Sequence, residues 1–209
     1  MAPMGISISI NDVSKKFGER TALRKVSANA ASGRVLVVTG QNGTGKSTLL
    51  KVVAGLIRPS TGEVRYSDGT STRDAARFRD RIGFISPELA LYEELTALDN
   101  LAFFAGLKGV QDPVAAGEAL LKRVGLLDRA DDPLGSFSSG MKQRVKFCFS
   151  LVNDPDVWLI DEPTANLDDP GKELAYSLIS ERRGRSAIII ATNEKEEVPL
   201  GDEAVILGK

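Results

Sequence analysis

Histidine is absent from this sequence, and cysteine occurs once, at position 148. The absence of histidine removes the commonest general base near neutral pH and the commonest nitrogen ligand of metal ions. Acid–base or metal chemistry must therefore rely on other side chains. The single cysteine excludes an internal disulfide and is typical of a reducing compartment. Because Cys148 lies in an apolar stretch with helical spacing, we interpret it as a buried, inert thiol.

The sequence also lacks long apolar runs and a strong net charge. No run approaches the roughly 20 residues that span a bilayer, and the first five residues do not resemble a signal peptide. The 27 basic and 28 acidic residues nearly balance, which gives no overall attraction to nucleic acid or to an anionic membrane. We therefore expect a soluble, cytoplasmic protein that binds no nucleic acid. Its 209 residues, 42% of them hydrophobic, suffice for one substantial domain, with room for an inserted subdomain.

Among the residues that are present, one segment predicts a phosphate-binding loop, or P-loop. Positions 40–47 fit the pattern G-x-x-x-x-G-K-[ST], between an apolar run at 35–39 and an amphipathic stretch that begins near position 46. In this strand–loop–helix order, backbone N–H groups and the positive end of the helix dipole bind phosphate oxygens. We predict that Lys46 reaches the β- and γ-phosphates and that the Ser47 hydroxyl ligates Mg²⁺. The nucleotide-binding residues predicted here are Gly40, Gln41, Asn42, Gly43, Thr44, Gly45, Lys46, Ser47 and Thr48.

Two carboxylates end a second apolar run, at positions 157–160. Acids at the end of a buried strand are costly unless some ligand needs them there. In P-loop proteins the first aspartate commonly holds Mg²⁺ through water, so Asp161 is a predicted metal ligand. Glu162 is then placed to act as the general base for a water that attacks the γ-phosphate. The alternative is a pair of acids that only caps the next turn.

Strand patterns alternate with helical ones along the chain, which predicts an α/β fold with a mostly parallel sheet. Alternation of serine with apolar residues at 6–10, followed by a turn at 17–20, predicts an antiparallel β edge layer. Phe17 lies at this turn beside Lys15 and Lys16. It can stack on a nucleotide base or plug the hairpin, and the residues alone favour neither.

Helical spacing dominates from position 87 to position 153. This segment predicts an inserted helical subdomain between two parts of a nucleotide-binding core, 1–86 and 154–209. Thr96 is the expected N-cap of its first helix, and Gly125 the expected end of its second. The basic stretch 67–81 is interpreted as a solvated helix face.

The motifs together resemble the ATPase subunits of ABC transporters. Residues 137–144, Phe-Ser-Ser-Gly-Met-Lys-Gln-Arg, look like the signature motif of that family, and 166–168 resemble its D-loop. The resemblance implies one ABC-type domain over 1–209, which pairs head to tail with a second subunit, as a homodimer, so that each signature faces its partner's ATP. It also implies that Phe17 stacks on adenine. The further nucleotide contacts implied in this way are Ser138, Ser139, Gly140, Met141 and Asp168.

Two positions depart from the family pattern. Where the family has a glutamine that contacts Mg²⁺ and the membrane partner, this chain has Pro87 or Glu88, so Glu88 is the implied third metal contact. Asn193 replaces the histidine that contacts the γ-phosphate in the family. The implied catalytic residues are therefore Lys46, Glu162 and Asn193. Asparagine can donate a hydrogen bond but carries neither the proton nor the charge of histidine. Hydrolysis is therefore expected to be slow.

The resemblance implies an ATPase with ATP and Mg²⁺ as cofactors, which powers a transmembrane permease from the inner face of the membrane. The short chain and the Ser-Ser-Gly-Met form of the signature resemble small exporters, among them the haem exporter of cytochrome c maturation. A dimerising module with weak or no hydrolysis is the alternative. A GTPase or nucleotide kinase lacks support because 193–196 do not give N-K-x-D. ABC proteins that act on ribosomes or DNA have fused units or long insertions that are missing here.

Overall fold

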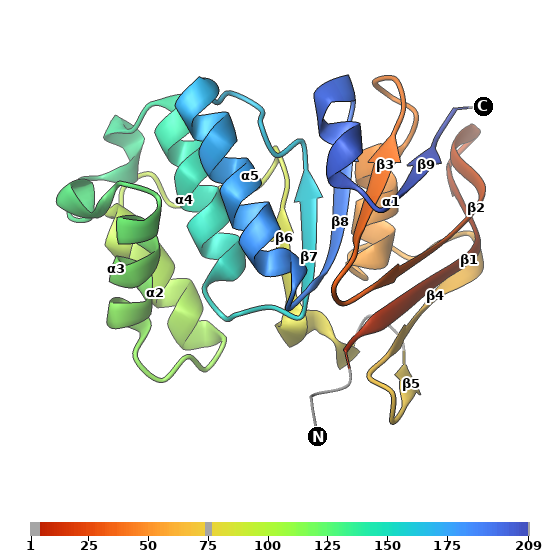
Figure 1. Cartoon of the computed structure of the whole chain (residues 1–209), viewed down its shortest axis with the longest axis horizontal. Coiled ribbons are helices and arrows are strands. Elements are labelled where there is room, and N and C mark those ends of the chain that lie inside the picture. The colour runs from red at the N-terminus through yellow and green to blue at the C-terminus, as the bar shows by residue number, and fades with distance from the viewer. Residues whose placement is uncertain (1–4, 74–76, 209) are drawn as a thin grey trace.

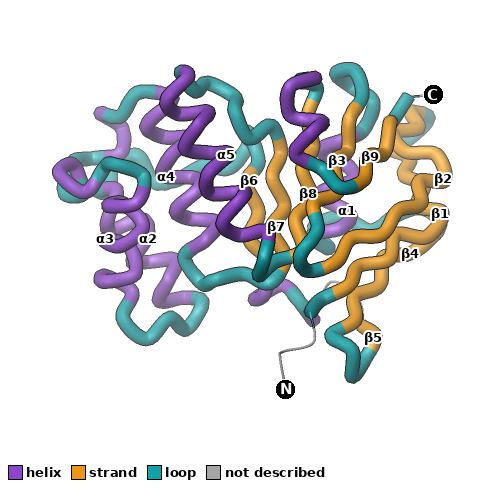
Figure 2. The backbone as a smooth tube through the Cα atoms, viewed as in Figure 1, coloured by secondary structure: helices purple, strands orange, loops and turns teal. Residues whose placement is uncertain are grey.

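The computed structural model describes residues 5–73 and 77–208, which form two β-sheets and two groups of helices (Figures 1 and 2). One sheet has five parallel strands. In spatial order they are β6 (Ile82–Ile85), β7 (Val157–Asp161), β8 (Ala187–Thr192), β3 (Val35–Thr39) and β9 (Glu203–Ile206). Because β7, β8 and β3 are neighbours, the residues that follow these strands meet at one edge of the sheet.

The second sheet is antiparallel and confirms the predicted edge layer. Its order is β2 (Arg20–Ala31), β1 (Ser7–Phe17), β4 (Thr61–Ser67) and β5 (Thr72–Arg73). A two-residue turn joins β1 to β2, with Phe17 paired to Arg20 and Gly18 at a φ of 57°. This sheet lies beside the parallel sheet on the right of Figure 1.

Helices cover both faces of the parallel sheet. The α-helices are α1 (Lys46–Val53), α2 (Ala97–Leu107), α3 (Pro113–Arg123), α4 (Ser139–Leu151) and α5 (Asp169–Arg183). Short 3₁₀ segments are η2 (Arg79–Arg81), η3 (Leu127–Arg129), η4 (Leu134–Ser136) and η5 (Lys195–Leu200). Along β3, Leu36 and Val38 pack into the core that contains α1 and the antiparallel sheet, whereas Val35 and Val37 pack into the core that contains α4 and α5. Because both faces of these strands are buried, their sequences are continuous apolar runs.

The helical part on the left of Figure 1 is built from α2, α3 and α4. Helix α2 packs on both α3 and α4, and α4 also packs on β6, so α4 joins this part to the sheet. Thr96 caps α2 as predicted, because its Oγ1 accepts a hydrogen bond from the Asp99 amide at 2.9 Å. The proposed division at positions 87 and 153 stays a prediction. Cys148 is fully buried in α4, and burial raises the pKa of its thiol, as expected for an inert cysteine.

Gly125 ends α3 in a Schellman motif. Its φ is 70°, its amide donates to Lys122 O at 3.2 Å, and the Leu126 amide donates to Leu121 O at 2.8 Å. The predicted end of this helix is therefore confirmed.

The helix expected at 67–81 is wrong for the part of this segment that the structure describes. Residues 74–76 lie outside the described residues. The segment instead contains β5 and η2, and Arg81 pairs with Asp156 at 2.5 Å. No helix in the described part of the chain is long and apolar enough to cross a membrane.

We predict opposite stability changes for alanine at two helix ends. Gly125→Ala should lower the free energy of unfolding by about 1 kcal/mol, because alanine is disfavoured at positive φ although no atom lies within 4 Å of the added Cβ. Gly184→Ala is the matched control: it has equal space but a φ of −72°, so it should be neutral or stabilising by about 0.5 kcal/mol. Urea unfolding measures both. Equal destabilisation would contradict the conformational explanation.

Candidate nucleotide-binding site

The P-loop runs from the end of β3 to the start of α1, and its glycines allow close backbone contacts. A Cβ on Gly45 would lie 2.3 Å from Ala22 O, and one on Gly40 would lie 2.6 Å from Leu207 O. Gly45 and Gly40 also have φ values of 101° and 150°. Glycine is required at both positions because larger residues would clash and adopt a disfavoured conformation.

Lys46 is buried at the base of the loop, with 5% of its surface exposed. Its Nζ donates hydrogen bonds to Gly40 O at 2.8 Å and Gln41 O at 3.2 Å. The N-cap of α1, Gly45, supplies no side-chain acceptor, and the first turn contains no acid. The amides at the start of α1 therefore remain free of side-chain caps and can bind phosphate.

A cavity of about 470 Å³ opens over this loop. Its lining residues are Phe17, Arg20, Ala22, Asn42, Gly43, Gly45, Lys46, Ser47, Thr48 and Glu162. Most of the predicted loop residues thus share one cavity with the predicted base, while Gly40, Gln41 and Thr44 do not line it. Thr44 instead donates from Oγ1 to Gln41 O at 2.8 Å.

Phe17 forms part of the cavity wall, and 51% of its surface is exposed. Lys15 Nζ lies 5.0 Å from the centre of the ring. An exposed ring beside the P-loop is suited to stacking on a base and does not plug the hairpin. The sequence reasoning missed Arg20 and Ala22, although their position just after Phe17 could have indicated them.

Asp161 ends β7 with only 2% of its surface exposed. Neither carboxylate oxygen has a hydrogen-bond partner of ordinary geometry among the described residues. Burial raises the pKa of this carboxyl, while the nearby Ser47 hydroxyl opposes the rise. A buried, unpartnered carboxylate beside a serine hydroxyl supplies the hard oxygen atoms that Mg²⁺ prefers, so the residues present fit this ion.

Glu162 has a backbone φ of 54°, which is unusual for a residue with a side chain. Its amide donates to Ala191 O at 2.8 Å, which fixes it against the end of β8. Positive φ at a residue held in this way is typical of functional sites.

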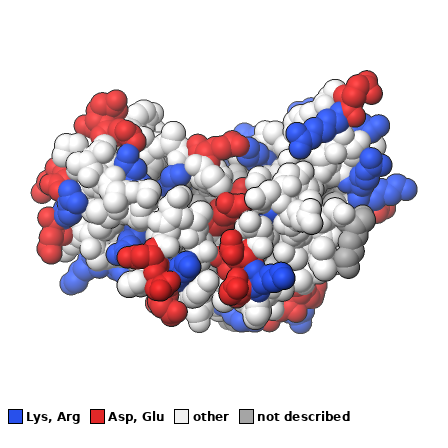
Figure 3. Space-filling view, turned by 90° about the horizontal axis from the view of Figure 1, so that it is seen from above, with Lys and Arg blue, Asp and Glu red and all other residues white. Residues whose placement is uncertain are grey.

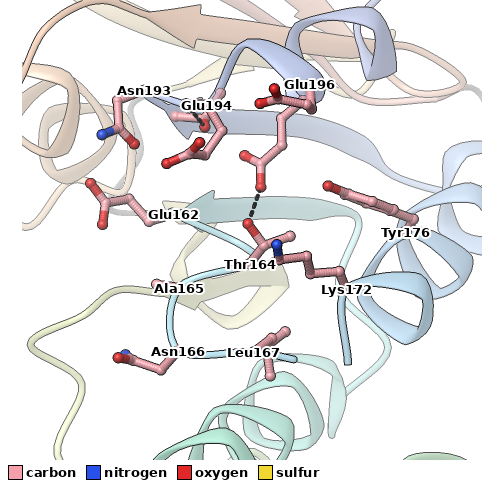
Figure 4. A pocket seen from close by; sticks show the side chains of 12 residues that line it. Glu162, Thr164, Ala165, Asn166, Leu167, Lys172, Tyr176, Asn193, Glu194 and Glu196 are labelled. Carbon is pink, nitrogen blue, oxygen red and sulfur yellow. Dashed lines mark hydrogen bonds between the residues drawn. The ribbon is translucent and has the colours of Figure 1, made fainter. Parts of the chain in front are cut away.

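Glu162 also lines a second cavity of about 730 Å³, together with Asn193 (Figure 4). Its other lining residues are Thr164, Ala165, Asn166, Leu167, Lys172, Tyr176, Thr192, Glu194, Glu196 and Glu197. Figure 3 views the molecule from above, toward the ends of β7 and β8, and shows acidic side chains across the middle of this face. The structure thus brings Glu162 and Asn193 to one cavity, while their roles in catalysis stay predictions.

The signature segment lies apart from both cavities within one chain. Ser138 caps α4, since its Oγ accepts from the Met141 amide at 3.2 Å, and Ser139 lines a separate cavity that also contains Asn166. Asp168 caps α5 through the Gly171 amide at 3.0 Å and pairs with Arg144 at 3.5 Å. Within one chain, the predicted nucleotide contacts of these segments line neither of the two cavities, and their contact with ATP stays a prediction; they are Ser138, Ser139, Gly140, Met141 and Asp168.

Glu88 is held away from the P-loop cavity. Its carboxylate pairs with Lys51 on α1 at 2.7 Å, and Lys146 on α4 donates to Pro87 O at 3.0 Å. Glu88 does not line the cavity over the P-loop, and Lys51 engages one oxygen of its carboxylate. Its role as a metal ligand stays a prediction.

A parallel sheet, a glycine-rich loop with a buried lysine and a carboxylate at the end of the neighbouring strand together define a P-loop nucleotide-binding domain. The family model described as "ABC transporter" matches residues 23–165. The chain belongs to this family. It is an ATP-binding ABC ATPase subunit of the kind that serves transporters.

Individual relatives agree with this assignment. The ABC transporter ATP-binding protein NatA of Bacillus subtilis is 33% identical over 96% of this chain and 85% of its own length. The cytochrome c biogenesis ATP-binding export protein CcmA of Haemophilus influenzae is 30% identical over 90% and 89%. A bacterial ABC transporter cassette solved as a dimer matches with a TM-score of 0.84 at 26% identity, over 96% of this chain and 94% of its own. The predicted α/β fold is confirmed by these structural matches.

We predict that Asp161→Asn separates stability from metal binding. Without nucleotide, the variant should melt at a higher temperature, because a neutral amide replaces a carboxylate whose charge is disfavoured by burial. The enhancement of ATP binding by Mg²⁺ should fall by about tenfold or more. Calorimetry with and without Mg²⁺ measures both effects. An unchanged response to Mg²⁺ would show that Asp161 does not serve the metal.

Proposed function

We propose that this chain hydrolyses Mg²⁺·ATP as one half of a head-to-tail pair of identical subunits and thereby drives a transmembrane permease. The observation that carries the proposal is the separation of two complementary parts on one chain. Lys46, Ser47 and Glu162 line the cavity over the P-loop, whereas Ser138 and Ser139 start α4 elsewhere. A second copy is needed to bring a signature segment to that cavity. The similar cassette that was solved as a dimer supports the pairing of two copies.

Each predicted group has a role that its position allows. Phe17 would stack on adenine, and residues 42–48 with Lys46 would bind the phosphates. Ser47 and Asp161 would hold Mg²⁺, which neutralises charge on the phosphate oxygens. Glu162 would accept a proton from the attacking water, while Asn193 would orient that water or the γ-phosphate by hydrogen bonding. Ser138, Ser139, Gly140, Met141 and Asp168 would act across the subunit boundary.

Export of haem or of a similar small molecule is the transport activity we propose. It is supported by the likeness to CcmA, whose name includes export, and by the 34% identity to the daunorubicin resistance ATP-binding protein DrrA3. In this role the protein would lie on the inner face of the membrane, bound to its permease. Identification of the membrane protein that copurifies with the chain tests both the partner and the direction of transport.

A dimerising module with weak hydrolysis is the second candidate. It is favoured by Asn193 in place of histidine and by the Lys51–Glu88 ion pair in place of a glutamine. Both candidates predict binding of ATP and dimerisation, so the rate of phosphate release distinguishes them.

We predict that Glu162→Gln forms a long-lived dimer with ATP and Mg²⁺. The substitution preserves the shape of the side chain and removes its function as a base, so ATP should remain bound and hold the pair together. Light scattering should show a dimer for the variant at saturating ATP. Lys122→Ala, on the exposed side of α3, is the control and should behave like wild type. A monomer under all conditions, with the permease also present, would contradict the proposal.

We predict that Asn193→His raises turnover. A charge-assisted hydrogen bond is roughly twice as strong as a neutral one, and each ~1.4 kcal/mol recovered in the transition state gives about a tenfold rate increase. ATP affinity should change little, because Asn193 does not line the P-loop cavity. Steady-state phosphate release from wild type, Asn193→His and Asn193→Ala measures the effect. Equal rates in all three would remove position 193 from the reaction.

A further inference from the structure

A buried hydrogen bond links the two segments that carry Glu162 and Asn193. Thr164 Oγ1 donates to Glu197 Oε1 at 2.5 Å, as the dashed line in Figure 4 shows. The two residues are 9% and 1% exposed, and both line the cavity of about 730 Å³. No role in nucleotide binding was predicted for either, since nothing in the sequence shows that they meet.

The burial of Glu197 is energetically unfavourable. Its Oε2 has no hydrogen-bond partner of ordinary geometry among the described residues. Burial raises the pKa of the carboxyl, while the hydroxyls of Thr164 and Thr192 oppose the rise. The acids Glu194 and Glu196 line the same cavity and add to the negative charge there. An apolar residue at position 197 would avoid this cost, so the carboxyl requires an explanation beyond packing.

The positions of the two partners in the chain suggest what the bond does. Thr164 lies two residues after Glu162, beyond the end of β7. Glu197 lies four residues after Asn193, within η5, which follows β8. The strands themselves are paired only up to Asp161 and Ala191. Beyond that pair, the Glu162 amide donates to Ala191 O, and the Thr164–Glu197 bond is a further link between the two segments.

Asn193 depends on this backbone for its placement. Its side chain is exposed and makes no hydrogen bond with the part of the chain that the structure describes. On its N-terminal side it is fixed by the pairing of β8 with β3, which ends at Thr192. On its C-terminal side, the Glu194 amide donates to Thr192 Oγ1 at 2.9 Å. The following η5 is held by the Glu197 hydrogen bond and by Val198 and Leu200, which pack against the core.

We infer that the Thr164–Glu197 hydrogen bond is a positioning element for ATP hydrolysis, which holds Asn193 at a fixed place relative to Glu162. The inference rests on the roles proposed above for these two residues. Neither Thr164 nor Glu197 lines the P-loop cavity, so ATP binding should not depend on the bond. Its loss should appear in kcat rather than in ATP affinity, because small misplacements of reacting groups slow the chemical step.

The test compares Thr164→Val with Thr164→Ser in the full-length protein. Valine keeps the shape of threonine and removes the donor, whereas serine keeps the donor. We expect Thr164→Val to lower kcat by about tenfold with ATP affinity changed less than about twofold, and Thr164→Ser to retain wild-type kcat. Glu197→Gln keeps an acceptor for the threonine hydroxyl and should also retain activity. If Thr164→Val does not fold, Thr164→Ala, which leaves space for water at Glu197 Oε1, replaces it.

A second background separates positioning from a general loss of stability. In the Asn193→Ala background, Thr164→Val should lower kcat by less than about twofold. The side chain of Asn193, through which the effect would act, is absent from that background. Ser150→Ala is the structural control: Ser150 Oγ accepts a buried hydrogen bond from Trp158 Nε1 at 2.9 Å, at the opposite end of β7. It should lower the melting temperature and leave kcat unchanged.

The results distinguish this inference from the function on which it rests. Wild-type activity in Asn193→Ala would overturn the role of Asn193 and the inference together. A loss of activity in Asn193→Ala with none in Thr164→Val would overturn the inference alone. Equal losses for Thr164→Val in both backgrounds, or an equal loss in Ser150→Ala, would also overturn it.

Discussion

Burial of the parallel sheet on both faces is the constraint on which the rest of the structure depends. Alternate residues of β3, β7 and β8 face two separate hydrophobic cores, so the strands have no face on which to display polar side chains. Polar groups can therefore gather only where the strands end. At one such edge the chain places Lys46, Asp161, Glu162 and Asn193, each at or just beyond a strand or at the start of the helix that follows. The site is thus a direct consequence of the sheet architecture.

How much the sequence could predict depends on whether a feature is local. The P-loop and the Asp161–Glu162 pair were recognisable because strand, loop and acids are adjacent in the chain, and the caps at Thr96 and Gly125 depend on residues within one turn. The error at 67–81 arose because clustered arginines suit an exposed strand and turn as well as a helix face. Contacts such as Lys51–Glu88 and Thr164–Glu197 join residues 37 and 33 positions apart. Such pairs require the fold to be known, since no local pattern encodes them.

The charges of the side chains that line the site do not balance within one chain. Among the described residues, Lys46 and Arg20 are the cations that line the P-loop cavity, and Glu162 lines it too. The neighbouring cavity carries Glu194, Glu196 and Glu197, and Lys172 is the one cation that lines it within the described chain. No group of three potential ligands in the described chain could hold a metal by itself, so phosphate and water oxygens would have to complete the shell of a bound Mg²⁺. Nucleotide, metal and site therefore depend on one another for charge balance.

The two departures from the family pattern, at Glu88 and Asn193, affect the charges at different places in the site. The Lys51–Glu88 pair is on the surface, with 74% of the Glu88 side chain exposed, so the pair alone adds little stability. With this pair formed, the charge of Lys51 still acts on the buried carboxylate of Asp161 and lowers the pKa of that group. Asn193, by contrast, leaves a neutral donor beside Glu162 in a strongly acidic cavity, where a histidine would gain a proton more readily. Under the proposed function, the first substitution would therefore affect the metal side of the phosphates, and the second would affect the side from which water attacks.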